Sequence, residues 1–599
     1  MKTIRIVAFI VLGGVFMFMN LSRVEAGNST IRVIRQQGLE VRLDLSTQVL
    51  GLDIPEEREW GQTSGKVEAE LYPTIKSVPG RADFVSASIM VAKAKQFDDG
   101  LYAAVEYLCQ NGTDRFIGKN ELLQRVAEAL KGPANDRVKG SDQSRSFIQA
   151  AANLGGQAIA GTKEIQRRAE EIKAKFLSDK LKSKPISFYT WTEELTRIFQ
   201  QDRLLQEPLD SELVSDLTQG LSIDASALKA YQAYLALVQK LTNPFPPEFS
   251  ALFLPLKTEK EKKYGFLPPS QAPETELVKK LYRNRPIPEG FNLLDELVKE
   301  IQKKAVDLAP REDSGWYAHQ IYSLEPLVNP ELMPEAKKLY FGEKYKKELI
   351  DLFKASLALT RETHIKQLEI PMAGAAPFDR SIPIIEIFPE LSAEPMATYY
   401  LRRAGSYRFV RELLASAFGD GALKNTRRLT PRGRVSRTLS EELCGMESLF
   451  SGAYQVVAEE IGMDPQLPLK SKKEREGDKK LAREWIRKFA EDPDVGADNR
   501  MMVPVFYDIK RKKTKVWVVL GYAVKPLAIW FKNEPQAVVL DAKGKEARAK
   551  LNFLDIRKPL IYPVSAEVYV NTIMNRDEFR ALCNKYKTPS AILNALRNL

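Results

Sequence analysis

The sequence predicts a mainly α-helical protein: a multi-helix body with a small N-terminal β-hairpin and a C-terminal antiparallel α+β domain. Apolar residues repeat at intervals of three and four through most of residues 83–463, and they alternate with polar residues near residue 40 and again after residue 500. The first spacing is typical of amphipathic helices and the second of half-buried strands. Of the 599 residues, 44% are hydrophobic and 28% are charged, which excludes a disordered chain and a multi-span membrane protein.

Residues 1–26 have the three parts of a secretory signal peptide. Lys2 and Arg5 precede an apolar run over residues 6–19, and Val24 and Ala26 occupy the positions that a signal peptidase recognises. The apolar run of 14 residues is shorter than the roughly 20 that a membrane-spanning helix needs. We therefore expect cleavage after Ala26 and a secreted or periplasmic protein without an integral membrane span. An uncleaved membrane anchor is the alternative.

Residues 27–82 are predicted to form a β-hairpin followed by an irregular segment. Leu39, Val41 and Leu43 alternate with charged residues, and a second apolar alternation at residues 31–33 precedes them. Two such runs separated by a short polar turn indicate a hairpin.

Residues 83–243 and 291–463 are predicted as two helical domains, joined by a proline-rich connection over residues 244–290. Proline removes a backbone donor and disfavours helix at the residue before it. Helical spacing is clear over residues 102–109, 120–130, 143–177 and 344–368. Thr190 with Glu193, and Thr438 with Glu441, fit the capping-box pattern of a helix start.

The last part of the chain is predicted to contain strands in place of the long helices before it. Residues 464–498 are predicted as a charged linker and helix. Residues 499–599 are predicted as an antiparallel β-rich domain of four to six strands with terminal helices, because alternating runs there are separated by charged turns.

The cysteines and histidines argue against metal or thiol chemistry. Cys109, Cys444 and Cys583 each lie in a helical-looking stretch, where small buried apolar residues are the expected role, although a disulfide in an oxidising compartment remains open. The chain has two histidines, and neither has a second strong ligand at helical spacing, so we expect no metal site. No cofactor is expected either, because an exported protein does not ordinarily meet ATP or NAD.

Two segments combine aromatic rings with carboxylates. Residues 188–194 and 312–319 are dense in both, and sugar rings stack on aromatic faces while glycoside hydrolysis uses two carboxylates. The candidate ligand-binding residues are Trp191, Trp316, Tyr317 and His319, and the candidate catalytic acids are Glu193, Glu194 and Asp313. The competing interpretation is that both segments are capped helix starts whose aromatic rings enter the core.

A cluster of arginines is the strongest candidate for anion binding. The guanidinium group binds carboxylates and phosphates through paired hydrogen bonds. No acid occurs over residues 421–437, and further arginines lie on a helix just before that stretch. The candidate anion-binding residues are Arg402, Arg403, Arg427, Arg428, Arg432 and Arg434. Pairing of these charges with acids from elsewhere in the chain is the alternative.

Together these features predict an exported, non-catalytic binding or scaffold protein that contacts an anionic polymer, a cell-surface component or a protein partner. The formal net charge of +12 favours anionic partners without specifying one. Nucleic acid is not expected, because no recognition module is visible. The alternative is a secreted glycan-directed hydrolase that uses the paired carboxylates. The nucleophile elbow Gly-x-Ser-x-Gly does not occur in the sequence.

Overall fold

A computed structural model gives the architecture of the chain. It describes residues 4–6, 19–22, 31–36, 39–44, 71, 85–131, 142–246, 249–252, 263–270, 272, 274, 277, 280–281, 288, 290–365, 391–467, 470–489, 492–494, 496–508, 511–527, 529–531, 536–540, 546–550, 558–586 and 588–599. The predicted cleavage site after Ala26, most of the apolar run before it and much of the proline-rich connection lie outside these residues.

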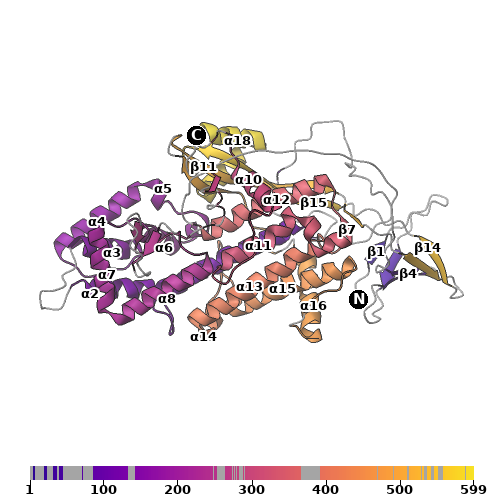
Figure 1. Cartoon of the computed structure of the whole chain (residues 1–599), viewed down its shortest axis with the longest axis horizontal. Coiled ribbons are helices and arrows are strands. Elements are labelled where there is room, and N and C mark those ends of the chain that lie inside the picture. The colour runs from indigo at the N-terminus through magenta and orange to yellow at the C-terminus, as the bar shows by residue number, and fades with distance from the viewer. Residues whose placement is uncertain are drawn as a thin grey trace.

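The protein is mostly helical with a few small sheets, as predicted. The first group of helices forms one end of the elongated body (Figure 1). It comprises α1 (Ala87–Asn111), α2 (Lys119–Ala129), α3 (Asp142–Leu154), α4 (Lys163–Ser178), α5 (Lys180–Ser183), the 3-10 helix η1 (Ser187–Thr190), α6 (Glu193–Leu205), α7 (Ser211–Ile223) and α8 (Ala225–Leu241).

The second group continues the body, with α13 and α15 packed side by side along one edge (Figure 1). It comprises α10 (Leu293–Gln302), α11 (Trp316–Val328), the 3-10 helices η2 (Pro330–Leu332) and η3 (Pro334–Lys337), α12 (Glu343–His364), α13 (Ala397–Phe418), α14 (Asp420–Asn425), α15 (Leu439–Glu460) and α16 (Lys472–Lys488).

Helix α1 runs through the interior of this body. Most of its 25 residues are buried, and it packs on helices of both groups, α2, α6 and α12 among them. A helix that is apolar all round suits such a position. Helix α1 differs, because Lys95, Asp98, Asp99 and Glu106 are buried along it with the apolar residues.

A three-stranded antiparallel sheet covers one side of the body in the order β10 (Met501–Asp508), β11 (Lys513–Leu527) and β15 (Lys558–Val570). Alternate residues of β11 face opposite ways. Trp517 and Val519 belong to the main core of the helical body, whereas Val516 and Val518 form a second core with α17 (Arg576–Lys585) and α18 (Pro589–Asn598). The sheet is thus buried on both faces.

The remaining strands form small sheets. One has the order β1 (Ile4–Ile6), β2 (Met19–Ser22), β3 (Ile31–Gln36), β4 (Leu39–Asp44), β13 (Gln536–Leu540) and β14 (Glu546–Lys550). The others pair β7 (Leu339–Tyr340) with β12 (Trp530–Phe531), β5 (Phe249–Ala251) with β6 (Lys263–Gly265), and β8 (Leu429–Thr430) with β9 (Gly433–Arg434). The strands of the C-terminal segment are therefore divided among three sheets rather than joined in one.

Several predicted helix ends are shifted. The helix predicted over residues 143–177 is broken between α3 and α4, where Gly156 has a φ of +85°. The capping box of Thr438 and Glu441 is present. The one predicted at Thr190 is not, because Thr192 caps α6 by accepting from the Leu195 amide. Helix α12 ends at His364, and residues 366–368 of its predicted extent lie outside the described part.

Among the described residues, no helix has both the length and the apolar character needed to cross a membrane.

Candidate functional site

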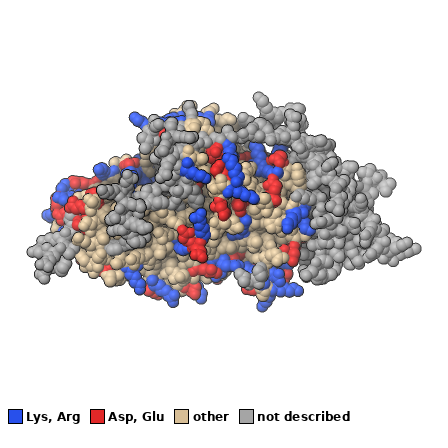
Figure 2. Space-filling view, viewed as in Figure 1, with Lys and Arg blue, Asp and Glu red and all other residues tan. Residues whose placement is uncertain are grey.

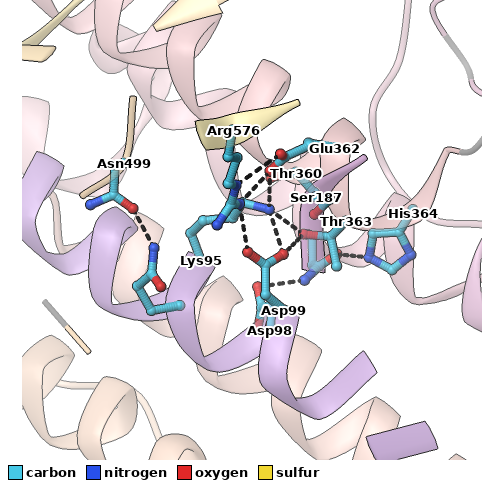
Figure 3. A network of polar contacts seen from close by, with 12 residues as sticks. Lys95, Asp98, Asp99, Ser187, Thr360, Glu362, Thr363, His364, Asn499 and Arg576 are labelled. Atoms are coloured by element: carbon cyan, nitrogen blue, oxygen red, sulfur yellow. Dashed lines mark hydrogen bonds and ion pairs between the residues drawn. The ribbon is translucent and has the colours of Figure 1, made fainter. Parts of the chain in front are cut away.

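The buried charges of α1 pair with two distant parts of the chain. Asp99 contacts the Lys95 ammonium at 2.5 Å and the Arg576 guanidinium of α17 at 2.9 Å. Glu362 of α12 lies 2.8 Å from Lys95 and 2.7 Å from Arg576, so two cations face two carboxylates (Figure 3). Burial disfavours the Glu362 carboxylate, but Arg576 and Lys95 outweigh burial and lower its pKa.

A second buried chain of contacts leads from Asp98 to His364. Asp98 accepts hydrogen bonds from Arg403, from the Tyr407 hydroxyl at 2.9 Å and from the Gln320 amide nitrogen at 2.8 Å. The Gln320 carbonyl oxygen lies 2.7 Å from Nε2 of His364. Burial raises the pKa of Asp98, while Arg403 opposes that rise.

His364 is enclosed by aromatic rings at the end of α12. The ring centroids of Tyr102, Trp316 and Tyr317 lie 5.1, 5.1 and 5.3 Å from the imidazole. Burial lowers the pKa of His364 well below its ordinary value, and Lys95 and Arg403 add to this effect. The imidazole is therefore neutral at pH 7. One dashed contact reaches the ring in Figure 3, and Nδ1 has no hydrogen-bond partner among the described residues.

A pocket opens beside His364 between α1, α6, α8 and α12. Its volume is about 660 Å³ with the open mouth included. Polar groups on its wall include Tyr102, Glu106, Asp202, Thr242 and His364. The remaining lining residues are Val105, Cys109, Gln206, Tyr234, Leu235, Val238, Leu241, Phe245, Leu267, Pro268, Ser270 and Ile365.

The two carboxylates of this pocket are linked by a lysine. Lys119 contacts Asp202 directly and lies 4.0 Å from Glu106. The Tyr189 hydroxyl donates to Glu106 at 2.5 Å. All four side chains are nearly inaccessible to solvent, so the two carboxylates of the pocket wall share a buried ammonium group that does not itself line the pocket.

The four candidate ligand-binding residues differ in their exposure to solvent. Trp316 and Tyr317 are completely buried and pack around His364, so neither offers a face to a sugar, and their prediction as ligand-binding residues is corrected. Trp191 is half-buried against Phe188. His319 is half-buried and stacks on Phe409 at 4.2 Å.

The three candidate catalytic acids are exposed. Glu193 forms an ion pair with Arg197 one helical turn away, while Glu194 and Asp313 lie at the surface. None of the three lines the pocket formed by the described residues. The structure does not bring two of them into that pocket with a tryptophan, as the hydrolase interpretation requires.

Three of the candidate arginines already bind internal carboxylates. Arg403 is buried against Asp98, and Arg428 is buried against Glu442 and Asp494 at 2.5 and 2.7 Å. Arg402 contacts Glu325 at 2.6 Å. Their prediction as anion-binding residues is corrected, because these guanidinium groups are occupied by the protein's own acids.

The other arginines lie on an exposed segment that we call the arginine hairpin, residues 427–437, which contains β8 and β9. Arg427, Arg432, Arg434 and Arg437 are exposed there, and none of them forms an ion pair with a described residue. Arg434 lies 5.2 Å above the Tyr107 ring of α1. The Tyr107 hydroxyl is 2.8 Å from that of Thr192, so the hairpin approaches the start of α6.

The cysteines conform only partly to expectation. Cys109 and Cys583 are buried, but Cys444 is exposed on α15, so the prediction of three buried thiols is wrong for that residue. Burial raises the pKa of Cys583 to about 11. Within the part of the chain that the structure describes, no group of three His, Cys, Asp or Glu side chains could hold a metal ion.

Sequence reasoning missed the pocket and the network behind it. The available signal was the run of charged residues within the apolar pattern of α1, such as Lys95, Asp98 and Asp99. Charges at helix positions that face a core are almost always paired. The charged residues of α1 therefore predict that oppositely charged partners exist, but not where in the chain those partners lie.

No family model, curated protein or solved structure matches this chain.

Proposed function

We propose that the protein is a non-catalytic binding or scaffold protein that works outside the cytoplasm and holds an anionic polymer on the arginine hairpin. The observation that carries this proposal is the exposure of Arg427, Arg432, Arg434 and Arg437 without an ion-pair partner among the described residues. On the face shown in Figure 2, charges of both signs are interspersed.

The base of the hairpin supports this role. Arg428 joins it to Glu442 and Asp494 inside the body, and Gly100 of α1 packs tightly on Leu429. A fixed hairpin loses little conformational freedom when its exposed forks bind carboxylates or phosphates. Glu441 lies near the hairpin. Hydrogen bonds from Thr438, with smaller contributions from Arg437 and Arg427, lower its pKa. One acid does not balance four arginines.

Retention on phosphocellulose tests the proposal. Replacing Arg427, Arg432, Arg434 and Arg437 by glutamine should lower the salt concentration needed for elution, since exposed charge contacts are screened by salt. The matched control replaces four exposed lysines of α16, Lys472, Lys473, Lys480 and Lys488, by glutamine and removes the same charge. Elution of both variants at the same salt concentration would contradict a specific role for the hairpin.

The extracytoplasmic location is part of the same proposal. It is supported by the basic start, the short apolar run and the small residues before Gly27. N-terminal sequencing of the protein made in its own host should find Gly27 as the first residue. Recovery of the intact chain from cytosol would contradict it.

We also propose the layout predicted for the two ends of the mature chain. The antiparallel pairing of β3 with β4 supports an N-terminal hairpin within residues 27–82. The order β10-β11-β15, with α17 and α18 packed on it, supports a C-terminal α+β unit within residues 499–599. Brief proteolysis should yield fragments that begin near residues 83 and 499.

A further inference from the structure

We propose that the polymer held by the arginine hairpin is an acidic polysaccharide in which carboxylated and neutral sugars alternate. The carboxylate of one sugar binds Arg432 and Arg434, and the neutral sugar beside it lies against Trp191 and Glu194. This inference rests on the proposed function and assigns the chemical class of the polymer. The contacts between the hairpin and the start of α6 support it.

Tyr107 of α1 joins the hairpin to the start of α6. The centre of its ring lies 5.2 Å from the Arg434 guanidinium, and its hydroxyl is 2.8 Å from that of Thr192, the N-cap of α6. Burial raises the pKa of Tyr107, and of the two charges beside it Glu194 adds to the rise while Arg434 opposes it. An exposed arginine and an exposed carboxylate therefore flank one half-buried tyrosine, and neither forms an ion pair with a described residue.

Trp191 adds an aromatic surface beside this contact. It is half-buried, and its ring meets that of Phe188 at a centroid distance of 6.1 Å with the two planes inclined by 64°. An inclined contact with one ring does not cover both faces of the indole. Because consecutive Cα atoms are about 3.8 Å apart, Trp191 lies next to Thr192 and thus close to the edge of the hairpin.

The hairpin side of this surface suits a carboxylate. Arg427 and Arg437 each donate to nearby backbone oxygens, whereas the guanidinium groups of Arg432 and Arg434 donate to no described residue. A guanidinium group pairs with a carboxylate through two parallel hydrogen bonds. Arg432 and Arg434 are therefore the two arginines of the hairpin best able to bind an acidic sugar.

The α6 side suits a neutral sugar. The apolar face of a sugar ring stacks on an aromatic ring, and sugar hydroxyls donate to a carboxylate. Glu193 forms an ion pair with Arg197, so Glu194 is the acid of this turn that is left to accept from a ligand. A second carboxylate placed here would be repelled by Glu194. A polymer that carries a charge on every unit therefore fits less well than one that alternates.

Binding of three anionic polymers to the whole protein tests the proposal. Hyaluronan alternates a carboxylated sugar with a neutral one, polygalacturonate has a carboxylate on every sugar, and polyphosphate carries charge without sugar. Fragments of equal chain length are compared at one ionic strength by isothermal titration calorimetry. We expect hyaluronan to bind about tenfold more tightly than the other two, because only its neutral sugars stack on Trp191.

Two variants separate the aromatic part of the surface from the arginines. Trp191→Ala should lower the affinity for hyaluronan about tenfold and leave that for polyphosphate unchanged. The matched control is Trp485→Ala, at a half-buried tryptophan of α16, which should leave both affinities unchanged. Replacing Arg432 and Arg434 together by glutamine should weaken the binding of all three polymers.

The outcomes distinguish this inference from the proposed function. Equal or tighter binding of polygalacturonate or polyphosphate by the unaltered protein would overturn the inference, as would a Trp191→Ala variant that loses all three polymers equally. In both cases the hairpin remains a site for anionic polymers in general. An arginine variant that binds every polymer as before would overturn the proposed function as well. The comparison of polymers on the unaltered protein stands even if a variant does not fold.

Discussion

The interior helix α1 and the arginine hairpin place their charges in opposite ways. On α1, Asp99 is completely buried and contacts Lys95 and Arg576. On the hairpin, Arg432 and Arg434 are exposed and form no ion pair with a described residue. The first arrangement holds distant segments together, whereas the second leaves guanidinium groups available to a ligand.

The same contrast occurs within the hairpin, between two adjacent arginines. Arg427 is exposed and hydrogen-bonds only backbone oxygens among the described residues, while Arg428 is buried between two carboxylates. Arg427 is thus exposed at the surface, whereas Arg428 fixes the hairpin to the body through its two ion pairs. The environment of an arginine, and not its presence in a basic run, decides what it can bind.

The largest effect is expected from breaking the buried network. Asp99→Asn keeps the size of the side chain but leaves Lys95 and Arg576 with Glu362 as their shared carboxylate. Removing one partner from a buried ion-pair network costs roughly 3–5 kcal/mol. Urea unfolding measures the loss, and Asp313→Asn at the surface is the control with an expected change below about 0.5 kcal/mol. Equal stability of the two variants would show that the network adds nothing.

The adjacent arginines give the sharpest test of the comparison. Arg428→Gln removes the guanidinium group shared by Glu442 and Asp494, leaves Asp494 with Lys93 at 3.8 Å, and should lower the free energy of unfolding by about 3 kcal/mol. Arg427→Gln should change it by less than about 0.5 kcal/mol. Thermal and urea unfolding of the two single variants measure the difference. Similar losses from both would contradict the distinction between anchor and surface.

The contact between α1 and the hairpin predicts a smaller effect. A methyl group at Gly100 would lie 2.0 Å from the Leu429 carbonyl oxygen and 2.6 Å from Cγ of Arg428. Gly100→Ala should therefore cost about 1–3 kcal/mol and disturb the hairpin. Gly405→Ala in α13, where a methyl group meets nothing within 4 Å, should stabilise the protein by up to about 1 kcal/mol. A neutral Gly100→Ala would refute the close packing.

The smallest effect is a pH dependence from His364. Burial lowers its pKa in the folded protein below the 6.5 of an exposed histidine. Below pH 6.5 the unfolded chain binds a proton that the folded chain does not, so stability is fully present above pH 6.5 and falls as the pH drops. The slope contributed by this residue approaches about 1.4 kcal/mol per pH unit. His364→Gln should remove that slope in urea unfolding at pH 5–7. If the pH dependence of the unfolding free energy persists in the variant, it arises from groups other than His364 and the prediction is wrong.

The sequence predicted what depends on local order and missed what depends on distant partners. The helix start at Thr438 is set by a capping residue and a glutamate three positions later, so it could be predicted. Trp316 was ambiguous, because the same aromatic residue near a helix start suits a sugar platform or a core, and only burial distinguishes the two. Pairing of the arginines with acids was one of two open interpretations, but the sequence could not say which arginines are paired or with which acids. Arg403 meets an acid 305 residues away in the chain, and no local pattern records that contact.

The ion pair between Asp99 and Arg576 joins residues 477 positions apart. During synthesis, helix α1 therefore lacks one of its counter-charges until Arg576 of α17 has been made. In a truncated product that lacks α17, Asp99 and Glu362 would share the one cation Lys95. These buried groups would then carry one unbalanced negative charge. The contact between Asp99 and Arg576 can therefore form only after α17 has been synthesised.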